Sequence, residues 1–417
     1  MKPLDSVIRG FRDVPLELIA YTVMDAFFWS LIRLIEAPYL RSLGFTPFEY
    51  GLFGSLLLAS YIVMLPISGW IIDRFRLIHV MIVSLIASSG SILLLVAGIK
   101  ILIYLSAFLW GFVGSIPSIG FTVLVSRVAK EEKYCYVYPY IEAIHMVGST
   151  VGNYAGWLPE IIVRTCGLSY LEVYRHTLLI VAILSLLTII PLIKIKTTDT
   201  PRTSRSVKGF IGSFKGIPKS TWRVISKIMV FEAITGLGAA ISIDNISYYF
   251  MLKYSVESGE LGTLYGTESL LMALLMMFMP EVSEFVGSPI KAYILVSFTS
   301  IPLLVAITFV NNYLLAFTLY IARSVLMNVA NPLFTAFMMA VVPPEHRGKA
   351  SSIVDLSSSV LSAIGRGLGG YMLDIDLELP LRLTATIYSL SLTYLFLVFK
   401  FFNYENLYKK NNMSLRY

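Results

Sequence analysis

Residues 51–76 read GLFGSLLLASYIVMLPISGWIIDRFR, and the first charged side chain among them is Asp73. Two arginines, Arg74 and Arg76, follow within three positions. About 20 consecutive apolar residues are enough to cross the hydrocarbon core of a bilayer as an α-helix. This stretch therefore predicts a membrane-spanning helix that ends near Asp73, with the two arginines at the level of the lipid headgroups.

The same pattern recurs along the whole chain. Of its 417 residues, 56% are hydrophobic and 14% are charged, whereas a soluble domain carries about 25% charged residues. Apolar stretches of spanning length lie at residues 15–38, 50–72, 77–99, 101–126, 136–160, 176–193, 228–252, 261–280, 290–310, 313–342, 350–373 and 382–402. The sequence therefore predicts an all-α integral membrane protein with twelve transmembrane helices.

Lysine and arginine residues are distributed unevenly over the two predicted sides of the membrane. With the N-terminus in the cytoplasm, the predicted cytoplasmic segments hold 24 of these residues and the outer loops hold 6. Cytoplasmic loops of membrane proteins carry such an excess. We therefore expect a multi-pass protein of the plasma membrane with both termini in the cytoplasm. The net charge of +7 then indicates contact with anionic headgroups and not with nucleic acid.

A polar segment, residues 194–227, divides the predicted helices into two sets of six. It holds nine basic residues and one acidic residue. We expect this segment to be a cytoplasmic linker between two six-helix bundles, residues 1–193 and 228–417.

The two halves of the chain also match each other. A shift of 211 positions places Gly51 on Gly262 and Asp73 on Glu284. Internal repeats of this kind are typical of transporters in which two bundles enclose a substrate site near the bilayer midplane. The predicted architecture is therefore two six-helix pseudo-repeat bundles around a central cavity.

One motif carries a more specific resemblance. The segment Gly69-Trp-Ile-Ile-Asp73-Arg74-Phe-Arg76 resembles the loop motif of the major facilitator superfamily, in which a glycine precedes Asp-Arg and further basic residues. The chain departs from that motif where Arg76 replaces a glycine. The resemblance implies a twelve-span secondary transporter that works by alternating access as a monomer.

The resemblance also implies a conformational latch in both halves. A carboxylate at the end of a spanning helix can meet a neighbouring helix N-terminus or a basic side chain in only one conformation. The alternative is that these residues are ordinary topology anchors. The predicted latch residues are Gly69, Asp73, Arg74, Arg76, Glu284, Gly287 and Arg347.

The first predicted span contains ionisable residues at helical spacing. Asp25, Trp29, Arg33 and Glu36 are three or four positions apart, which places them on one helical face. Charges inside a membrane persist when they face a protein interior or a water-filled cavity, so we expect this face to point inward. Arg33 is predicted to pair either with Glu36 across one turn or, through the resemblance, with Asp244 of the seventh span.

The fifth predicted span contains two titratable residues, Glu142 and His145, followed by small residues. Proton coupling through Asp25, Glu142 or His145 is one interpretation, since histidine changes charge near neutrality. A structural, hydrogen-bonded histidine is the alternative. Small residues at this spacing let helices approach closely, and the sequence also resembles the antiporter motif of drug-exporting family members. The small residues and their neighbour are Gly148, Gly152, Asn153 and Gly156.

Two arginines, Arg323 and Arg366, lie inside the tenth and eleventh spans. They could bind backbone carbonyls or acidic partners, or they could recognise a carboxylate or phosphate of a substrate. A cavity with aromatic residues and net negative charge would favour cationic amphiphiles, whereas convergent arginines would favour anions. No metal or cofactor motif and no enzyme signature is present.

These observations lead to one prediction with two alternatives. We expect a secondary transporter that exports small amphipathic compounds in exchange for protons. The closest alternative is a symporter or uniporter for a small organic anion. A non-transporting sensor or a lipid-handling protein on the same scaffold is the alternative from another class.

Overall fold

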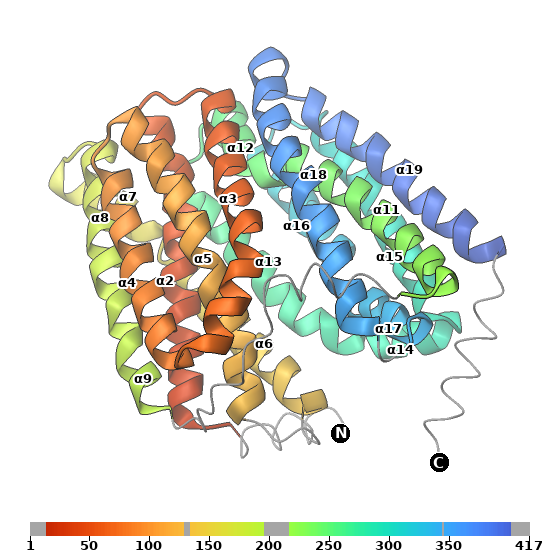
Figure 1. Ribbon diagram of the computed structural model, residues 1–417. Helices are drawn as coiled ribbons and strands as arrows, with labels where there is room; N and C mark the ends of the chain where they lie inside the picture. The colour runs from red at the N-terminus through yellow and green to blue at the C-terminus, as the bar shows by residue number, and fades with distance from the viewer. Residues whose placement is uncertain (1–13, 129–133, 196–216, 344–345, 402–417) are drawn as a thin grey trace. The chain divides into compact units, whose positions relative to one another are not determined.

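The computed structural model describes residues 14–128, 134–195, 217–343 and 346–401. All regular secondary structure within these ranges is helical (Figure 1). Residues 196–216, which form most of the predicted linker, lie outside the described residues.

The helices of the first half follow the predicted apolar stretches closely. Each begins or ends at most a few positions from its predicted bounds, except that the fifth and sixth spans are broken into shorter pieces. The elements are α2 (Leu16–Ser42), α3 (Pro47–Arg74), α4 (Leu77–Val96), α5 (Lys100–Val128), α6 (Tyr134–Tyr154), α7 (Trp157–Cys166), α8 (Tyr170–Ser185), η2 (Leu186–Thr188) and α9 (Ile189–Lys194).

The helices of the second half show more interruptions. The seventh span begins nine residues earlier than predicted, at Lys219 instead of 228, and is broken at Ile243–Asn245. The elements are α11 (Lys219–Ser242), η3 (Ile243–Asn245), α12 (Ile246–Tyr254), α13 (Ser258–Leu275), η4 (Met276–Phe278), α14 (Met279–Val286), α15 (Pro289–Ile307), α16 (Tyr313–Asn328), α17 (Asn331–Val341), α18 (Arg347–Ile375) and α19 (Leu379–Phe401).

The break at η3 coincides with hydrogen bonds from the side chain of Asn245, both to nearby carbonyls and to a distant one. This buried amide donates hydrogen bonds to the carbonyls of Ala240 and Ile241, at 3.1 and 3.3 Å, and to that of Arg366 at 3.1 Å. A side chain that bonds to nearby carbonyls competes with the helical ladder. The periodicity of residues 228–252 did not predict this break.

In the described part of the chain, nine helices are long and apolar enough to cross a membrane. The three predicted spans that do not reach this measure, 136–160, 261–280 and 350–373, are helical but more polar, because they carry carboxylates, serines and glycines along their length. The helical membrane-protein fold is therefore confirmed, and the count of twelve stays a prediction.

The chain forms two compact units, which are described separately. Unit 1 consists of Met1–Thr46, Leu56–Phe210 and Ser255–Leu270. A hydrophobic core joins α2, α4, α5 and α6 in this unit; its fully buried members include Leu18, Leu77, Met81, Leu124 and Val137. Unit 1 thus contains most of the first six predicted spans together with the start of α13.

Unit 2 consists of Pro47–Ser55, Ile211–Tyr254 and Leu271–Tyr417. Aromatic side chains fill its interior, where Phe231 packs against Phe334 at 5.2 Å and Phe250 packs against Phe317 at 4.9 Å between ring centroids. The start of α3 belongs to this unit, and the ring of Tyr50 stacks on that of Tyr248 at 4.6 Å.

Candidate functional site

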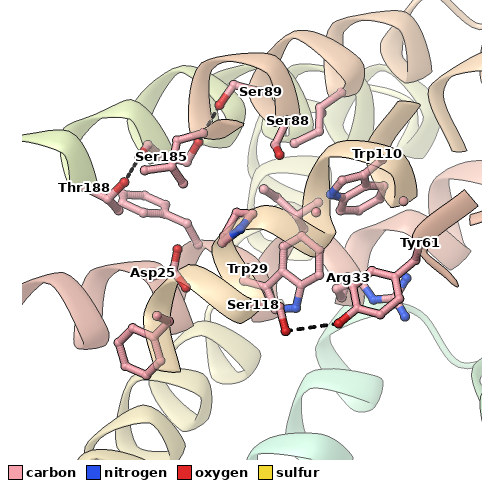
Figure 2. Close-up of a pocket in the computed structure, with 18 of the residues that line it drawn as sticks. Asp25, Trp29, Arg33, Tyr61, Ser88, Ser89, Trp110, Ser118, Ser185 and Thr188 are labelled. Carbon is pink, nitrogen blue, oxygen red and sulfur yellow. Dashed lines mark hydrogen bonds between the residues drawn. The ribbon is translucent and has the colours of Figure 1, made fainter. Parts of the chain in front are cut away.

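Unit 1 contains a partly open cavity of about 510 Å³ between α2, α3, α4, α5, α6 and α8. Ligand sites for small molecules have volumes of about 300–1,000 Å³. Most of the wall is apolar or aromatic, and the polar side chains gather in a few places (Figure 2). The polar and charged lining residues are Tyr21, Thr22, Asp25, Arg33, Tyr61, Ser88, Ser89, Ser118, Glu142, His145, Ser185 and Thr188.

Three residues of α2 line the cavity in succession. Asp25, Trp29 and Arg33 are four positions apart, so each lies one turn above the last on the same face of the helix. Glu36 is one further turn along and is only 1% exposed. The predicted inward-facing stripe of α2 therefore forms one wall of the cavity.

Arg33, at the C-terminal end of this stripe, makes two kinds of contact. Its Nη1 lies 3.2 Å from the carboxylate of Glu36. Its guanidinium also lies 6.0 and 5.9 Å from the ring centroids of Trp29 and Trp110, which meet edge to face at 5.1 Å. The predicted pairing across one turn with Glu36 is confirmed. The pair with Asp244, a residue of unit 2, stays a prediction.

Asp25 has a different environment from Arg33. No hydrogen bond or ion pair to its carboxylate is found among the residues that the structure describes, and it is partly buried in the wall. Its nearest titratable neighbour on α2 is Tyr21, one turn away. Charged groups inside a membrane persist where they face a protein interior or a water-filled cavity, and Asp25 faces this cavity.

Glu142 and His145 of α6 also line the cavity, where Glu142 is exposed and His145 is partly buried. The glycines that follow them hold α6 against α2. A Cβ atom on Gly148 would lie 2.7 Å from the carbonyl of Val23, and one on Gly152 would overlap the carbonyl of Phe27. Gly148 and Gly152 therefore permit the close approach that fixes the position of Glu142 and His145.

The last two residues of this motif contact other segments of unit 1. Gly156 leaves room for Leu34 and for the carbonyl of Ser258, and Asn153 is 8% exposed. The carbonyl of Asn153 lies directly against Gly262. The small residues at the end of α6 thus allow both α2 and the start of α13 to pack closely against it.

Two sets of lining residues were missed by the sequence analysis because that analysis followed ionisable side chains. The hydroxyl groups of Ser89, Ser185 and Thr188 form a polar wall on α4, α8 and η2, and Tyr61 donates a hydrogen bond to Ser118 at 3.1 Å (Figure 2). The run Ser-Ser-Gly-Ser at residues 88–91, inside an otherwise apolar stretch, was the available signal.

Asp244, Arg323 and Arg366 belong to unit 2 and do not line this cavity. Asp244 is exposed within η3. Arg323 is 1% exposed, and its guanidinium lies 5.3 Å from the ring centroid of Tyr388. Arg366 is 3% exposed, lies 5.5 Å from the ring of Tyr50 and donates a hydrogen bond to its hydroxyl at 3.4 Å. A role for the three residues in a substrate pathway stays a prediction.

The predicted latch residues of the first half lie at the junction of α3 and α4. Asp73, Arg74 and Arg76 are exposed, and Arg74 lies 5.3 Å from the ring centroid of Trp70. Arg76 precedes α4 with an extended backbone (φ −63°, ψ 120°). Because this turn needs no left-handed residue at that position, an arginine can replace the glycine of the related motif. A Cβ atom on Gly69 would meet no atom within 4 Å.

In the second half, Gly287 ends α14 in the left-handed conformation (φ 77°), and its N–H donates to the carbonyls of Ser283 and Glu284. Only glycine adopts this conformation without steric cost. The Glu284 side chain is exposed, and Arg347 donates its Nε to the carbonyl of Val342 at 3.3 Å. The latch role of these residues stays a prediction.

The described residues contain no group of three or more His, Cys, Asp or Glu side chains able to hold a metal ion.

Comparison with known proteins gives the family. The profile of the Major Facilitator Superfamily matches the chain twice, at residues 18–254 and 228–412. No curated protein sequence matches the chain significantly.

Solved structures share the fold at low sequence identity. The alignment with the nucleoside transporter NupG spans 93% of this chain and 99% of NupG. The two share 14% sequence identity, and the TM-score is 0.70. A bacterial homologue of the human lysosomal transporter Spinster, inward-facing and occupied, covers 93% of this chain, which covers 96% of it, with 14% identity and a TM-score of 0.72. The human organic anion transporter MFSD10 covers 92% of this chain, which covers all of MFSD10, with 13% identity and a TM-score of 0.61. Two profile matches over most of the chain, on a helical fold with a cavity of ligand size, establish that this protein belongs to the Major Facilitator Superfamily and is a multi-pass secondary transporter of small molecules.

Proposed function

We propose that this protein exports small amphipathic compounds across the plasma membrane in exchange for protons, by alternating access. The observation that carries the proposal is the composition of the unit 1 cavity. Aromatic side chains line a space of about 510 Å³ that also holds the carboxylate of Asp25, which has no ion-pair partner among the described residues. An apolar site with a few polar groups suits an amphipathic compound, and a carboxylate without a counter-ion suits a transferable proton.

Glu142 and His145, on a second helix of the cavity wall, support proton coupling. Both carry ionisable side chains, and both lie on α6, which packs directly on the helix that carries Asp25. Two further ionisable side chains therefore line the cavity that holds Asp25. The rival interpretation of His145 as a structural hydrogen-bonded residue predicts that its replacement changes stability but not coupling.

Transport of a small organic anion by symport or uniport is the second candidate. The observation in its favour is Arg33, which lines the cavity with a side chain 35% exposed. Its charge is offset by Glu36, and Arg323 and Arg366 make aromatic contacts inside unit 2 instead of lining the same cavity. One structural relative is an organic anion transporter, but at 13% identity that resemblance reaches the fold alone. A non-transporting sensor or a lipid-handling protein remains the candidate from another class.

The same proposal includes the architecture and topology predicted from the sequence. These are the bundles 1–193 and 228–417, the linker 194–227, the cytoplasmic termini, contact with anionic headgroups and a monomeric state. The bundles and the linker rest on the polar segment that divides the spans and on the match between the two halves. The cytoplasmic termini and the headgroup contact rest on the excess of basic residues in the predicted cytoplasmic segments, and the monomeric state rests on the usual condition of the family.

Reconstituted liposomes with an internal pH-sensitive dye test the proposal. Addition of amphipathic amines and of small carboxylates in separate experiments should move protons for one class only, and Asp25→Asn and Glu142→Gln should reduce that movement. The matched control is Glu281→Gln, which removes an exposed carboxylate of α14 in unit 2. Substrate flux without proton movement in the wild type would exclude coupling and favour the uniporter.

A further inference from the structure

The cavity in unit 1 differs in polarity between its two ends. Asp25 and Arg33 lie eight residues apart on one face of α2, which corresponds to about 12 Å along the helix axis. Trp29 stands between them. A ligand in this cavity therefore meets one kind of polar group at the Asp25 end and another at the Arg33 end.

The Arg33 end is close to electrically neutral. Glu36, 1% exposed, lies 3.2 Å from the guanidinium. The same guanidinium is flanked by the faces or edges of Trp29 and Trp110 at about 6 Å. The indole N–H of Trp110 is buried without a hydrogen-bond partner in the described residues. This end of the cavity therefore carries little net charge.

Three hydroxyl groups that line the cavity together with Asp25 have already donated their protons. Thr22 donates to the carbonyl of Leu18 at 2.8 Å. Ser185 donates to the carbonyl of Ala182 at 2.7 Å, and Thr188 donates to that of Ser185 at 2.7 Å. Each hydroxyl has one proton and two acceptor lone pairs. These three groups therefore offer the cavity only acceptors.

Ser89 completes the same wall. Its hydroxyl lies 3.1 Å from that of Ser185. With the Ser185 proton on the carbonyl of Ala182, the shorter of its two contacts, Ser89 is the donor to Ser185, and the lone pairs of Ser89 remain. Figure 2 shows Ser89, Ser185 and Thr188 on the α4 and α8 side and Asp25 on α2. The cavity thus combines the carboxylate of Asp25, which has no ion-pair partner in the described part of the chain, with four acceptor hydroxyls.

From this arrangement we infer the chemical class of the substrate: an aromatic primary amine whose ammonium group binds at Asp25 and whose ring lies against Trp29, Trp110 and Tyr61. The inference rests on the proposed transport function and adds to it the charge and the hydrogen-bond character of the compound. An ammonium group carries three N–H donors and no acceptor. These donors match the acceptor hydroxyls and the Asp25 carboxylate that line the cavity. A carboxylate ligand would instead be repelled by the negative charge of Asp25, and it would find hydroxyl lone pairs where it needs hydrogen-bond donors.

Three probes of similar shape test the inference by isothermal titration calorimetry on the purified full-length protein in detergent at pH 7. They are 2-phenylethylammonium, its N,N,N-trimethyl analogue and 3-phenylpropionate. Primary alkyl amines are protonated at this pH, as lysine is. We expect the primary ammonium to bind, the trimethyl compound to bind roughly tenfold more weakly because it lacks N–H donors, and the carboxylate to give no binding heat.

Variants separate the two elements of the site. Asp25→Asn keeps the shape and removes the charge, so it should weaken binding of the primary ammonium at least roughly tenfold. Ser185→Ala removes one acceptor and should narrow the difference between the primary and the trimethyl compound, a readout that a merely structural effect would not move. Glu281→Gln, far along the chain in unit 2, should leave all three isotherms unchanged.

Tighter binding of 3-phenylpropionate than of 2-phenylethylammonium would overturn the inference, as would unchanged ammonium affinity in a folded Asp25→Asn variant. The order of the three probes in the wild type decides the question even if that variant does not fold. Proton movement is measured separately in liposomes. Amine binding without coupled protons would defeat the proposed antiport alone, whereas proton movement driven by carboxylates alone would defeat this inference alone.

Discussion

The carboxylate of Glu160 in α7 accepts a hydrogen bond of 2.5 Å from the backbone N–H of Gly259 in the first turn of α13. The two residues are 99 positions apart, and Glu160 is only 2% exposed. A carboxylate at a helix N-terminus satisfies one of the free N–H groups there and interacts favourably with the helix dipole. This contact is one of those that join the segment Ser255–Leu270 to the rest of unit 1.

Glu160→Ala should therefore destabilise unit 1. The substitution leaves the buried N–H of Gly259 without its acceptor, a loss of roughly 1–3 kcal/mol, and the thermal unfolding midpoint in detergent should fall. Glu160→Gln retains an acceptor oxygen and is the matched control, with a smaller decrease expected. Equal midpoints for Glu160→Ala and the wild type would show that the contact does not hold α13.

Gly152→Ala should separate α6 from α2. A Cβ atom at this position overlaps the carbonyl of Phe27 and the hydroxyl of Ser30, and overpacking of this kind costs about 1–3 kcal/mol. The control is Gly90→Ala in α4, where a Cβ would meet nothing within 4 Å. Thermal unfolding of the two variants should differ clearly, and similar midpoints would contradict the close packing of α6 on α2.

Lys253 and Glu378 form an ion pair of 2.6 Å in unit 2, with side chains 12% and 16% exposed. Lys253 also donates to the carbonyls of Ile307 and Thr308. Lys253→Met alone leaves Glu378 without its counter-ion, for which the expected loss is at most about 3–5 kcal/mol. The double variant Lys253→Met, Glu378→Gln should recover part of this stability in a double-mutant cycle. Strictly additive effects would mean that the pair contributes nothing.

Glu36→Gln should weaken the binding of 2-phenylethylammonium. The substitution leaves the positive charge of Arg33 uncompensated about 12 Å from Asp25, where repulsion lowers the affinity by about two- to tenfold. The effect should shrink as the salt concentration rises. Glu17→Gln, at the start of α2, is the control. An affinity that Glu36→Gln does not change would show that Arg33 is screened from the cavity.

Glu257 provides a pH-dependent contact outside the predicted spans. Burial raises the pKa of its carboxyl above the usual value, although the hydroxyl of Tyr174, which donates at 2.9 Å, and the charge of Arg41 oppose this. Since the folded pKa is raised, its contribution to stability is complete at pH below the unfolded pKa of about 4.3 and is lost as pH rises through the folded pKa.

The unfolding midpoint of the wild type should therefore fall over this pH window, and Glu257→Gln should remove that part of the dependence. Differential scanning fluorimetry across the window measures both. A Glu257→Gln profile parallel to that of the wild type would assign the pH dependence to other groups.

Several features of the site followed from the sequence because they depend on local spacing. Asp25, Trp29 and Arg33 share one face of α2 through the 3.6-residue period alone, and Glu36 lies within reach of Arg33 for the same reason. The predicted role of Gly152 in helix packing likewise agrees with the overlap that a Cβ would make.

Other features depended on contacts between distant segments. The hydroxyl groups of Ser89 and Ser185 meet across 96 positions, and nothing in either local pattern specifies the pairing. The break of α11 at η3 depends partly on Asn245 bonding to the carbonyl of Arg366, 121 positions away.

The sequence by itself determined the helical membrane-protein class, the family and the face of α2 that carries charge, because bilayer thickness and helical period act on neighbouring residues. Only the tertiary structure decided that the charge of Arg33 is offset by Glu36 while Asp25 has no cationic partner in the described residues. It also decided that the hydroxyl groups of the cavity wall present acceptors. Charge balance and hydrogen-bond direction in a cavity depend on how several helices rotate against one another, and the period of one helix does not fix this.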